Sequence, residues 1–109
     1  MNLSIVTTPE FDKSVNKLFK RYKLIPKDLT LLEKELNANP QAGIDIGSNC
    51  FKIRLANSSV PTGKSGGFRV IYFLRTKEKI YLLAIYSKSD LENLDEKRLV
   101  EILVANGLT

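Results

Sequence analysis

The stretch that decides the fold is residues 50–73, CFKIRLANSSVPTGKSGGFRVIYF. It is typical of two β-strands joined by a glycine- and serine-rich loop, because apolar and basic residues alternate in its first part. The alternation puts Phe51, Ile53 and Leu55 on one face of the first strand and the basic residues between them on the other. The pattern therefore predicts a sheet with one apolar face and one basic face.

The chain around this stretch is strongly basic. From Ile46 to Lys77 there are six Lys or Arg residues and no Asp or Glu. A sheet that gathers cations on one face without neutralising acids is suited to bind an anion, and polyphosphate is the commonest candidate. We expect five cations to converge at one end of the sheet: Lys52, Arg54, Lys64, Arg69 and Lys88. The alternative is a solvated face that only limits aggregation.

Composition narrows the class of protein. The 109 residues predict a single domain spanning residues 1–109, and a hydrophobic content of 43% is enough for a packed core. The net charge of +5 favours nucleic acid or an acidic protein as partner. Residues 63–67, GKSGG, contain only part of the P-loop motif, so we do not expect this loop to bind a nucleoside triphosphate. We expect its Lys64 to contact an RNA backbone.

Several kinds of site are excluded by the residues that the chain lacks. Without histidine, the chain cannot form a Ser-His or Cys-His triad. Its one cysteine, Cys50, cannot form a disulfide framework and is expected to be a small core residue. No signal peptide and no long apolar run is present, so we expect a cytoplasmic protein without membrane contact. Neither a metal nor a cofactor is expected.

The remaining periodicities predict an α+β domain of order β-α-α-β-β-β-α. A helical hairpin would cover one face of a mainly antiparallel sheet, and the other face would stay partly open. Thr7 and Glu10 have the spacing of a capping box at the first helix. The run IYLLAIY at 80–86 predicts a central strand that is covered on both faces. The predicted strands are 3–7, 50–56, 68–75 and 80–86, with a loop or weak edge strand at 41–47 and helices following Thr7, Ile25 and Asp95.

Several sequence segments, taken in order, resemble those of a known family. FDKSVNKLFKRY, CFKIRLA, GKSGGFRVIYF and IYLLAIYSKSDLENL, in that order, are similar to the RelE/ParE superfamily of bacterial type II toxins, and most similar to its HigB-like, RelE-type branch. The resemblance implies a toxin that inhibits translation as a ribosome-dependent mRNA endonuclease (an mRNA interferase). It also implies a cognate antitoxin, the ribosome and mRNA as partners.

Site residues follow from the same resemblance, position by position. The catalytic set would be Lys52, Arg54, Arg69 and Lys88. Apart from the resemblance, the loop position of Lys64 and the place of Tyr86 at the end of its strand lead us to expect that these two residues bind RNA. Some RelE toxins carry a catalytic tyrosine at a position that Leu94 occupies in this chain. No tyrosine follows Tyr86, which would have to substitute for it. A ParE-like toxin that inhibits gyrase and a non-catalytic RNA-binding module stay open as alternatives, because a shared fold does not settle function.

The basic residues also suggest a chemistry. RNA carries its own nucleophile, the 2′-hydroxyl, and cations can stabilise the extra negative charge of the phosphorane transition state. We hypothesise that Lys52 acts as or assists the general base, that Arg54 and Arg69 hold the phosphate, and that Lys88 lies near the leaving group.

Overall fold

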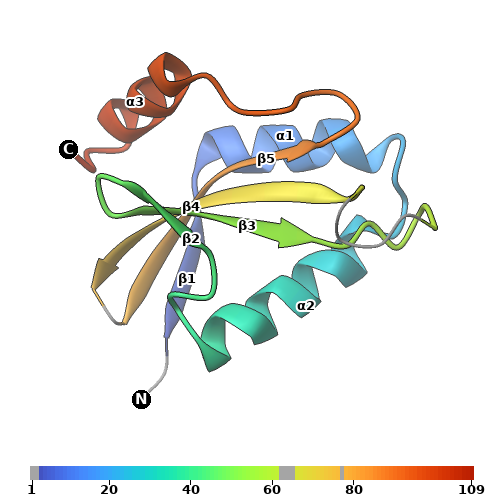
Figure 1. The fold of residues 1–109 in the computed structure, drawn as a ribbon, viewed down its shortest axis with the longest axis horizontal. Helices are drawn as coiled ribbons and strands as arrows, with labels where there is room; N and C mark the ends of the chain where they lie inside the picture. The colour runs from blue at the N-terminus through green and yellow to red at the C-terminus, as the bar shows by residue number, and fades with distance from the viewer. Residues whose placement is uncertain (1–2, 62–65, 77) are drawn as a thin grey trace.

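The computed structural model describes residues 3–61, 66–76 and 78–109. These residues form a five-stranded sheet with helices on both of its faces (Figure 1). In chain order the elements are β1 (Ser4–Thr7), α1 (Pro9–Phe19), α2 (Ile25–Ala38), β2 (Ile44–Gly47), β3 (Cys50–Leu55), β4 (Phe68–Thr76), β5 (Lys79–Ser87) and α3 (Glu96–Ala105).

The strand order is β1-β5-β4-β3-β2. β1 runs parallel to β5, whereas the other neighbouring strands are antiparallel. The predicted α+β class and mainly antiparallel sheet are therefore confirmed. The segment at 41–47 contains the weak edge strand, β2, whose four residues are all exposed.

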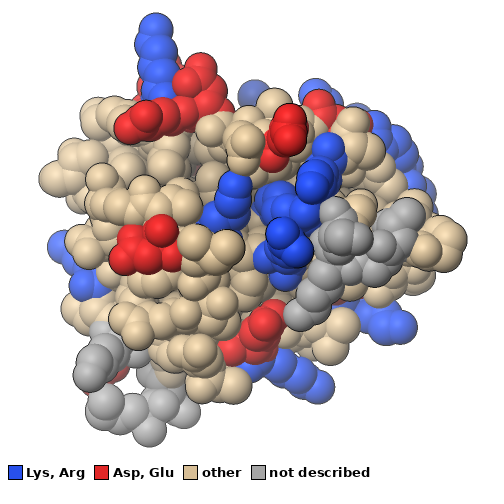
Figure 2. Space-filling model, viewed as in Figure 1, with Lys and Arg blue, Asp and Glu red and all other residues tan. Residues whose placement is uncertain are grey.

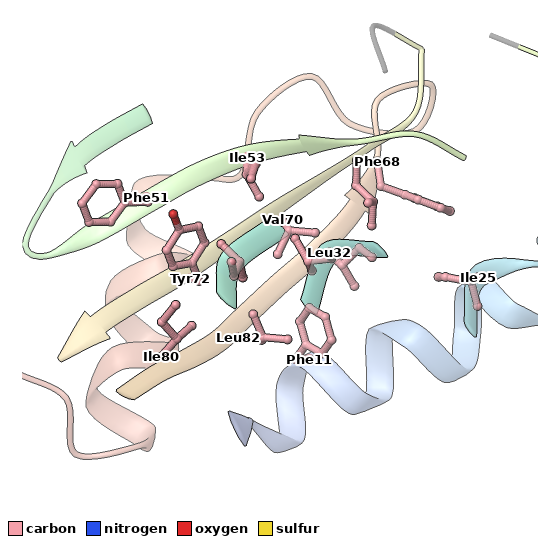
Figure 3. Close-up of a cluster of buried hydrophobic side chains, with 13 residues drawn as sticks. Phe11, Ile25, Leu32, Phe51, Ile53, Phe68, Val70, Tyr72, Ile80 and Leu82 are labelled. Atoms are coloured by element: carbon pink, nitrogen blue, oxygen red, sulfur yellow. The ribbon is translucent and has the colours of Figure 1, made fainter. Parts of the chain in front are cut away.

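One face of the sheet carries the larger core, against which α1 and α2 pack. Figure 3 shows Phe11, Ile25 and Leu32 of these helices facing apolar side chains of the strands. Phe51 and Tyr72, on the neighbouring strands β3 and β4, have stacked rings with centroids 5.4 Å apart. The predicted apolar face of β3 is thus the face covered by the helical pair.

The opposite face is partly covered by α3, which packs its Ile102 and Leu103 on β4 and β5. β5 therefore contributes side chains to both cores, Leu82 and Ile85 to the first and Leu83 and Ala84 to the second. This burial confirms the prediction from the continuous apolar run. No helix in residues 3–61, 66–76 and 78–109 is long and apolar enough to span a membrane.

The start of α1 differs by one residue from the predicted capping box. The N-cap is Thr8, not Thr7, and its hydroxyl accepts a hydrogen bond from the Phe11 backbone N–H at 3.2 Å. The same hydroxyl donates to the Leu82 carbonyl at 2.9 Å. Thr7 still belongs to β1, so pairing with β5 decides which threonine caps the helix.

A buried carboxylate joins α2 to the segment that follows β3. Asp28 is fully buried and accepts hydrogen bonds from the backbone N–H of Ser58, at 3.0 Å, and from the Ser58 hydroxyl. One residue further on, the Ser59 hydroxyl accepts from the Leu24 backbone N–H at 3.1 Å. Asp28 therefore fixes the exit of β3 against the start of α2.

Asp28→Ala is expected to lower the free energy of unfolding by about 3 kcal/mol, because it removes the buried carboxylate that accepts two hydrogen bonds from Ser58. Urea denaturation followed by circular dichroism would measure the loss. Asp12→Ala, which removes an exposed carboxylate from α1, is the matched control and should cost less than about 1 kcal/mol. Equal losses in the two variants would show that the Asp28 contacts are energetically unimportant.

Cys50 begins β3 and is completely buried in the core under α3. Burial, with a smaller effect of Asp45, raises the pKa of its thiol to about 11. Because the thiolate is the reactive form, a thiol reagent at pH 8 should modify the unfolded chain and leave the folded chain unmodified for hours. Mass spectrometry along a urea series would test this, and rapid modification without urea would contradict the burial.

Candidate functional site

The basic residues of the central strands form a row across the sheet. Arg54 on β3 is the register partner of Arg69 on β4, which in turn is the partner of Tyr86 on β5. The neighbouring residues Phe51, Ile53 and Leu55 point to the opposite core, so this row lies on the face that carries α3. Figure 2 shows Lys and Arg atoms gathered over the end of the sheet where β3 ends and β4 begins. The predicted convergence of Arg54 and Arg69 is therefore observed.

Lys52 lies one step further along the same face of β3. It is half-buried, and its Nζ donates a hydrogen bond to Oδ1 of Asn93 at 2.8 Å. Asn93 belongs to the segment between β5 and α3, so this bond holds that segment over the sheet. Sequence reasoning missed Asn93, since nothing in the pattern links a loop asparagine to a lysine on a distant strand.

Arg69 follows Phe68 at the start of β4, and its side chain is enclosed although the face it belongs to was predicted to stay partly open. Its exposed fraction is only 5%. Burial, followed by the neighbouring charge of Arg54, lowers the pKa of its guanidinium, and one of its N–H groups donates to the Phe68 carbonyl at 3.2 Å. A guanidinium stays protonated despite such a shift. Arg69 is therefore a buried cation beside a second, exposed cation.

Lys88 is exposed just beyond β5, and its backbone N–H donates to the Gly67 carbonyl at 3.1 Å. This bond ties the residue after β5 to the residue before β4, at the same end of the sheet as Arg69. Lys64 lies outside the described residues, so its predicted contact with RNA stays a prediction.

Tyr86 is the last residue of the row, and its side chain is buried inside the protein. Only 7% of its surface is exposed, and within the described residues its buried hydroxyl makes no hydrogen bond of ordinary geometry. Burial raises the pKa of this hydroxyl, while the nearby backbone of Leu94 and the charge of Arg69 lower it to a smaller extent. The Tyr86 side chain thus lies beside the position at which the resemblance would place a tyrosine.

A second hydrogen-bonded group holds the segment around Lys88 to the turn that follows α1. The guanidinium of Arg21 donates to the Tyr22 hydroxyl at 2.7 Å and forms an ion pair with Asp90. Hydrogen bonds from Ser87 and Arg21 lower the pKa of Tyr22. The Tyr22 ring packs edge-on against Phe68, and its hydroxyl belongs to this polar group.

A small sheet with a helical pair on one face and a row of cations on the other defines a class of compact α+β proteins suited to polyanions. The model of the RelE toxin of the RelE/RelB toxin–antitoxin system matches residues 11–106, which is most of the chain. The chain belongs to this family and is a toxin of a type II toxin–antitoxin system.

A solved structure supports the fold. An arginine-to-alanine double mutant of the E. coli toxin RelE, in its free state, is similar with a TM-score of 0.56 at 18% sequence identity. The match covers 84% of this chain and 90% of the other. At this identity the likeness concerns the fold.

Proposed function

We propose that this toxin is a ribosome-dependent mRNA endonuclease of the HigB-like, RelE-type branch, and that it acts in the cytoplasm by stopping translation. The observation that carries the proposal is the cross-strand row of Arg54, Arg69 and Tyr86 with Lys52 beside it. Family membership supports the same activity. A protein that only bound gyrase would not need cations arranged around a single point on the sheet.

The two arginines are the groups that we assign to the phosphate. As register partners on adjacent strands they present two planar donors to one anion, and guanidinium groups bind phosphate oxygens bidentately. Because Arg69 is buried, its charge is poorly screened by water and acts strongly on a phosphate at the mouth of the site. Donors that are fixed before the reaction stabilise the phosphorane without reorganisation.

Proton transfer is assigned to Lys52, Lys88 and Tyr86. Lys52 would act as or assist the base that removes the 2′-hydroxyl proton, after its Nζ leaves Asn93. Lys88, at the exposed end of β5, is placed to meet the departing 5′-oxygen. The Tyr86 hydroxyl, close to the backbone of Leu94 and under the influence of Arg69, is the local substitute for a tyrosine at position 94. Lys64 is expected to bind the RNA backbone.

In-vitro translation with primer extension on the message tests the proposal. Cuts in phase with codons, seen only when ribosomes are present, are the expected result. Naked RNA should be cut at least about a hundredfold more slowly, because the ribosome supplies the orientation that this site does not provide alone. Inhibition of DNA supercoiling by gyrase without any cut in the message would instead support the ParE-like alternative.

We expect an acidic antitoxin segment to neutralise the toxin by binding the basic residues of the cross-strand row. Opposite charges accelerate association, and salt screens them beyond about 8 Å at physiological ionic strength. The association rate should therefore fall by at least about tenfold between 50 and 500 mM salt, as stopped-flow fluorescence can measure. A Lys52/Arg54 double alanine variant should show a flatter salt dependence.

Lys13→Ala/Lys17→Ala is the matched control for this measurement, because it removes the same charge from α1. A wild-type rate that does not depend on salt, or equal changes in the two double variants, would show that the antitoxin binds elsewhere.

A further inference from the structure

Lys88 lies in a hydrogen-bonded turn, residues 87–91, that follows β5. The backbone N–H groups of Asp90 and Leu91 both donate to the Ser87 carbonyl, at 3.0 and 3.1 Å. The two serine hydroxyls on either side of Lys88, those of Ser87 and Ser89, are 2.8 Å apart, and the Ser89 backbone N–H donates to Ser87 Oγ at 3.3 Å. The turn is therefore closed on Ser87 and carries Lys88 as its one cation.

This turn is attached to two different parts of the fold. The backbone N–H of Lys88 donates to the Gly67 carbonyl, which precedes β4, at 3.1 Å. From the turn that follows α1, the guanidinium of Arg21 forms an ion pair with Asp90. The position of the Lys88 backbone is thus fixed both by the sheet and by the connection between α1 and α2.

The Tyr22 hydroxyl is at the centre of the second attachment. It accepts a hydrogen bond from the Arg21 guanidinium at 2.7 Å. Hydrogen bonds from Ser87, and to a smaller extent from Arg21 and Ser89, lower the pKa of this hydroxyl. Its ring packs edge-on against Phe68, with centroids 5.5 Å apart, and Phe68 is the register partner of Ser87. Tyr22 therefore contacts the start of β4 with its ring and the end of β5 with its hydroxyl.

Stability is not the main contribution of these contacts. The side chains of Arg21 and Asp90 are both about half exposed, and an exposed ion pair adds little to the free energy of unfolding. The rate of a reaction depends more steeply on geometry, since a displacement of about 1 Å can slow it by about a hundredfold. Contacts that contribute little to stability can therefore be important when they fix the backbone of a residue that carries a reacting group.

We propose that Arg21, Tyr22 and Asp90 are positioning residues of the endonuclease, which hold the turn at 87–91 so that Lys88 meets the departing 5′-oxygen. The inference rests on the proposed function. Arg69 directly follows Phe68, on which the Tyr22 ring packs, so the same contacts set the place of the Lys88 turn relative to Arg69. The three positioning residues act through Lys88 and do not themselves touch the RNA.

Single variants of the full-length toxin give the first test. Tyr22→Phe keeps the ring and removes the hydroxyl, and Asp90→Asn removes the charge from the ion pair. Each should slow cleavage at saturating ribosomes by about tenfold and leave the KM for ribosomes unchanged. Arg21→Ala should do the same, and Arg21→Lys should recover most of the rate because it keeps the charge that pairs with Asp90. Glu92→Gln, which neutralises an exposed carboxylate two residues after Asp90, is the matched control and should cut as the wild type does.

A double-mutant cycle with Lys88→Ala shows whether the group acts through Lys88. Asp90→Asn should slow the wild type by about tenfold but should slow Lys88→Ala by less than about twofold, because the residue that it positions is already gone. An equal factor in both backgrounds would show a general structural role and would overturn the proposal. Unchanged cleavage by Lys88→Ala would overturn it as well.

Hydrogen exchange at the Lys88 amide, measured by NMR, follows the turn without any RNA. Tyr22→Phe and Asp90→Asn should each speed this exchange by about tenfold, because the bond to the Gly67 carbonyl opens more often. The amide of Val70, in the middle of the sheet, should exchange as slowly as in the wild type. Unchanged exchange at Lys88 in both variants would show that the group does not hold the turn.

The results separate the two proposals. If the wild type cuts message and the Tyr22→Phe and Asp90→Asn variants cut as fast, the positioning role is wrong, although the endonuclease assignment holds. If the wild type cuts no message, the endonuclease assignment is wrong and the role in cleavage falls with it. Faster exchange at Lys88 in the variants would in that case still show that Arg21, Tyr22 and Asp90 hold the turn.

Discussion

Arg69→Ala is expected to slow cleavage of ribosome-bound mRNA by about a hundredfold, which corresponds to the loss of one transition-state donor worth about 3 kcal/mol. The loss should appear in the cleavage rate measured at saturating ribosome concentration, because Arg54 still binds the phosphate in the ground state. Arg69→Lys should recover little activity, since an ammonium group cannot replace two parallel guanidinium donors.

The fold should withstand the same change. Arg69→Ala removes the hydrogen bond to the Phe68 carbonyl and also the like-charge repulsion with Arg54, and because these effects oppose each other the urea midpoint should move little. Arg75→Ala, at the exposed far end of the same strand, is the control and should keep wild-type activity. A folded Arg69→Ala variant that cuts at wild-type speed would remove Arg69 from the catalytic set.

Gly67→Ala is expected to be the most damaging single-methyl change, with a loss of about 3 kcal/mol in the free energy of unfolding. A Cβ at this position would lie 2.3 Å from the Leu55 carbonyl oxygen and 3.0 Å from the Asn57 nitrogen. Both are backbone atoms, so the ends of β3 and β4 must move apart. Cleavage should fall as well, because the Gly67 carbonyl holds the backbone of Lys88.

Gly107→Ala gives the comparison for Gly67→Ala. Gly107 has a φ of +66° and open space around its Cβ position, so alanine meets backbone strain of about 1 kcal/mol but no clash. Urea denaturation should therefore give a clearly lower free energy of unfolding for Gly67→Ala than for Gly107→Ala. The reverse ranking would show that the junction of β3 and β4 can relax around an added methyl group.

Much of the fold could be predicted because its signals are local. Alternation in residues 51–55 gave the two faces of β3, and the apolar run at 80–86 gave a strand buried on both sides. The capping threonine was misplaced by one residue because pairing of β1 with β5, which is not local, extends the strand to Thr7.

The adjacency of Arg54 and Arg69 could be predicted from the sequence, but the surroundings of these residues could not. The spacing in β3 and β4 indicated Arg54 and Arg69, yet an arginine in an alternating strand gives no sign that its side chain will be enclosed. The contacts of Lys52 with Asn93 and of Asp28 with Ser58 join residues far apart in the sequence. Periodicity, which compares near neighbours, cannot detect such pairs.

The parallel pairing of β1 with β5 has a consequence for the order in which the protein forms. β1 precedes the other described strands in the chain, but Ser4–Thr7 pairs with Lys79–Leu82 of the last of them, β5, and with no other strand among the described residues. Contacts this distant along the chain form late and slow folding. The hairpin of β3 and β4, which carries Arg54 and Arg69, is complete in the nascent chain before β1 has a partner. The two arginines that are register partners are thus brought together before the sheet can close.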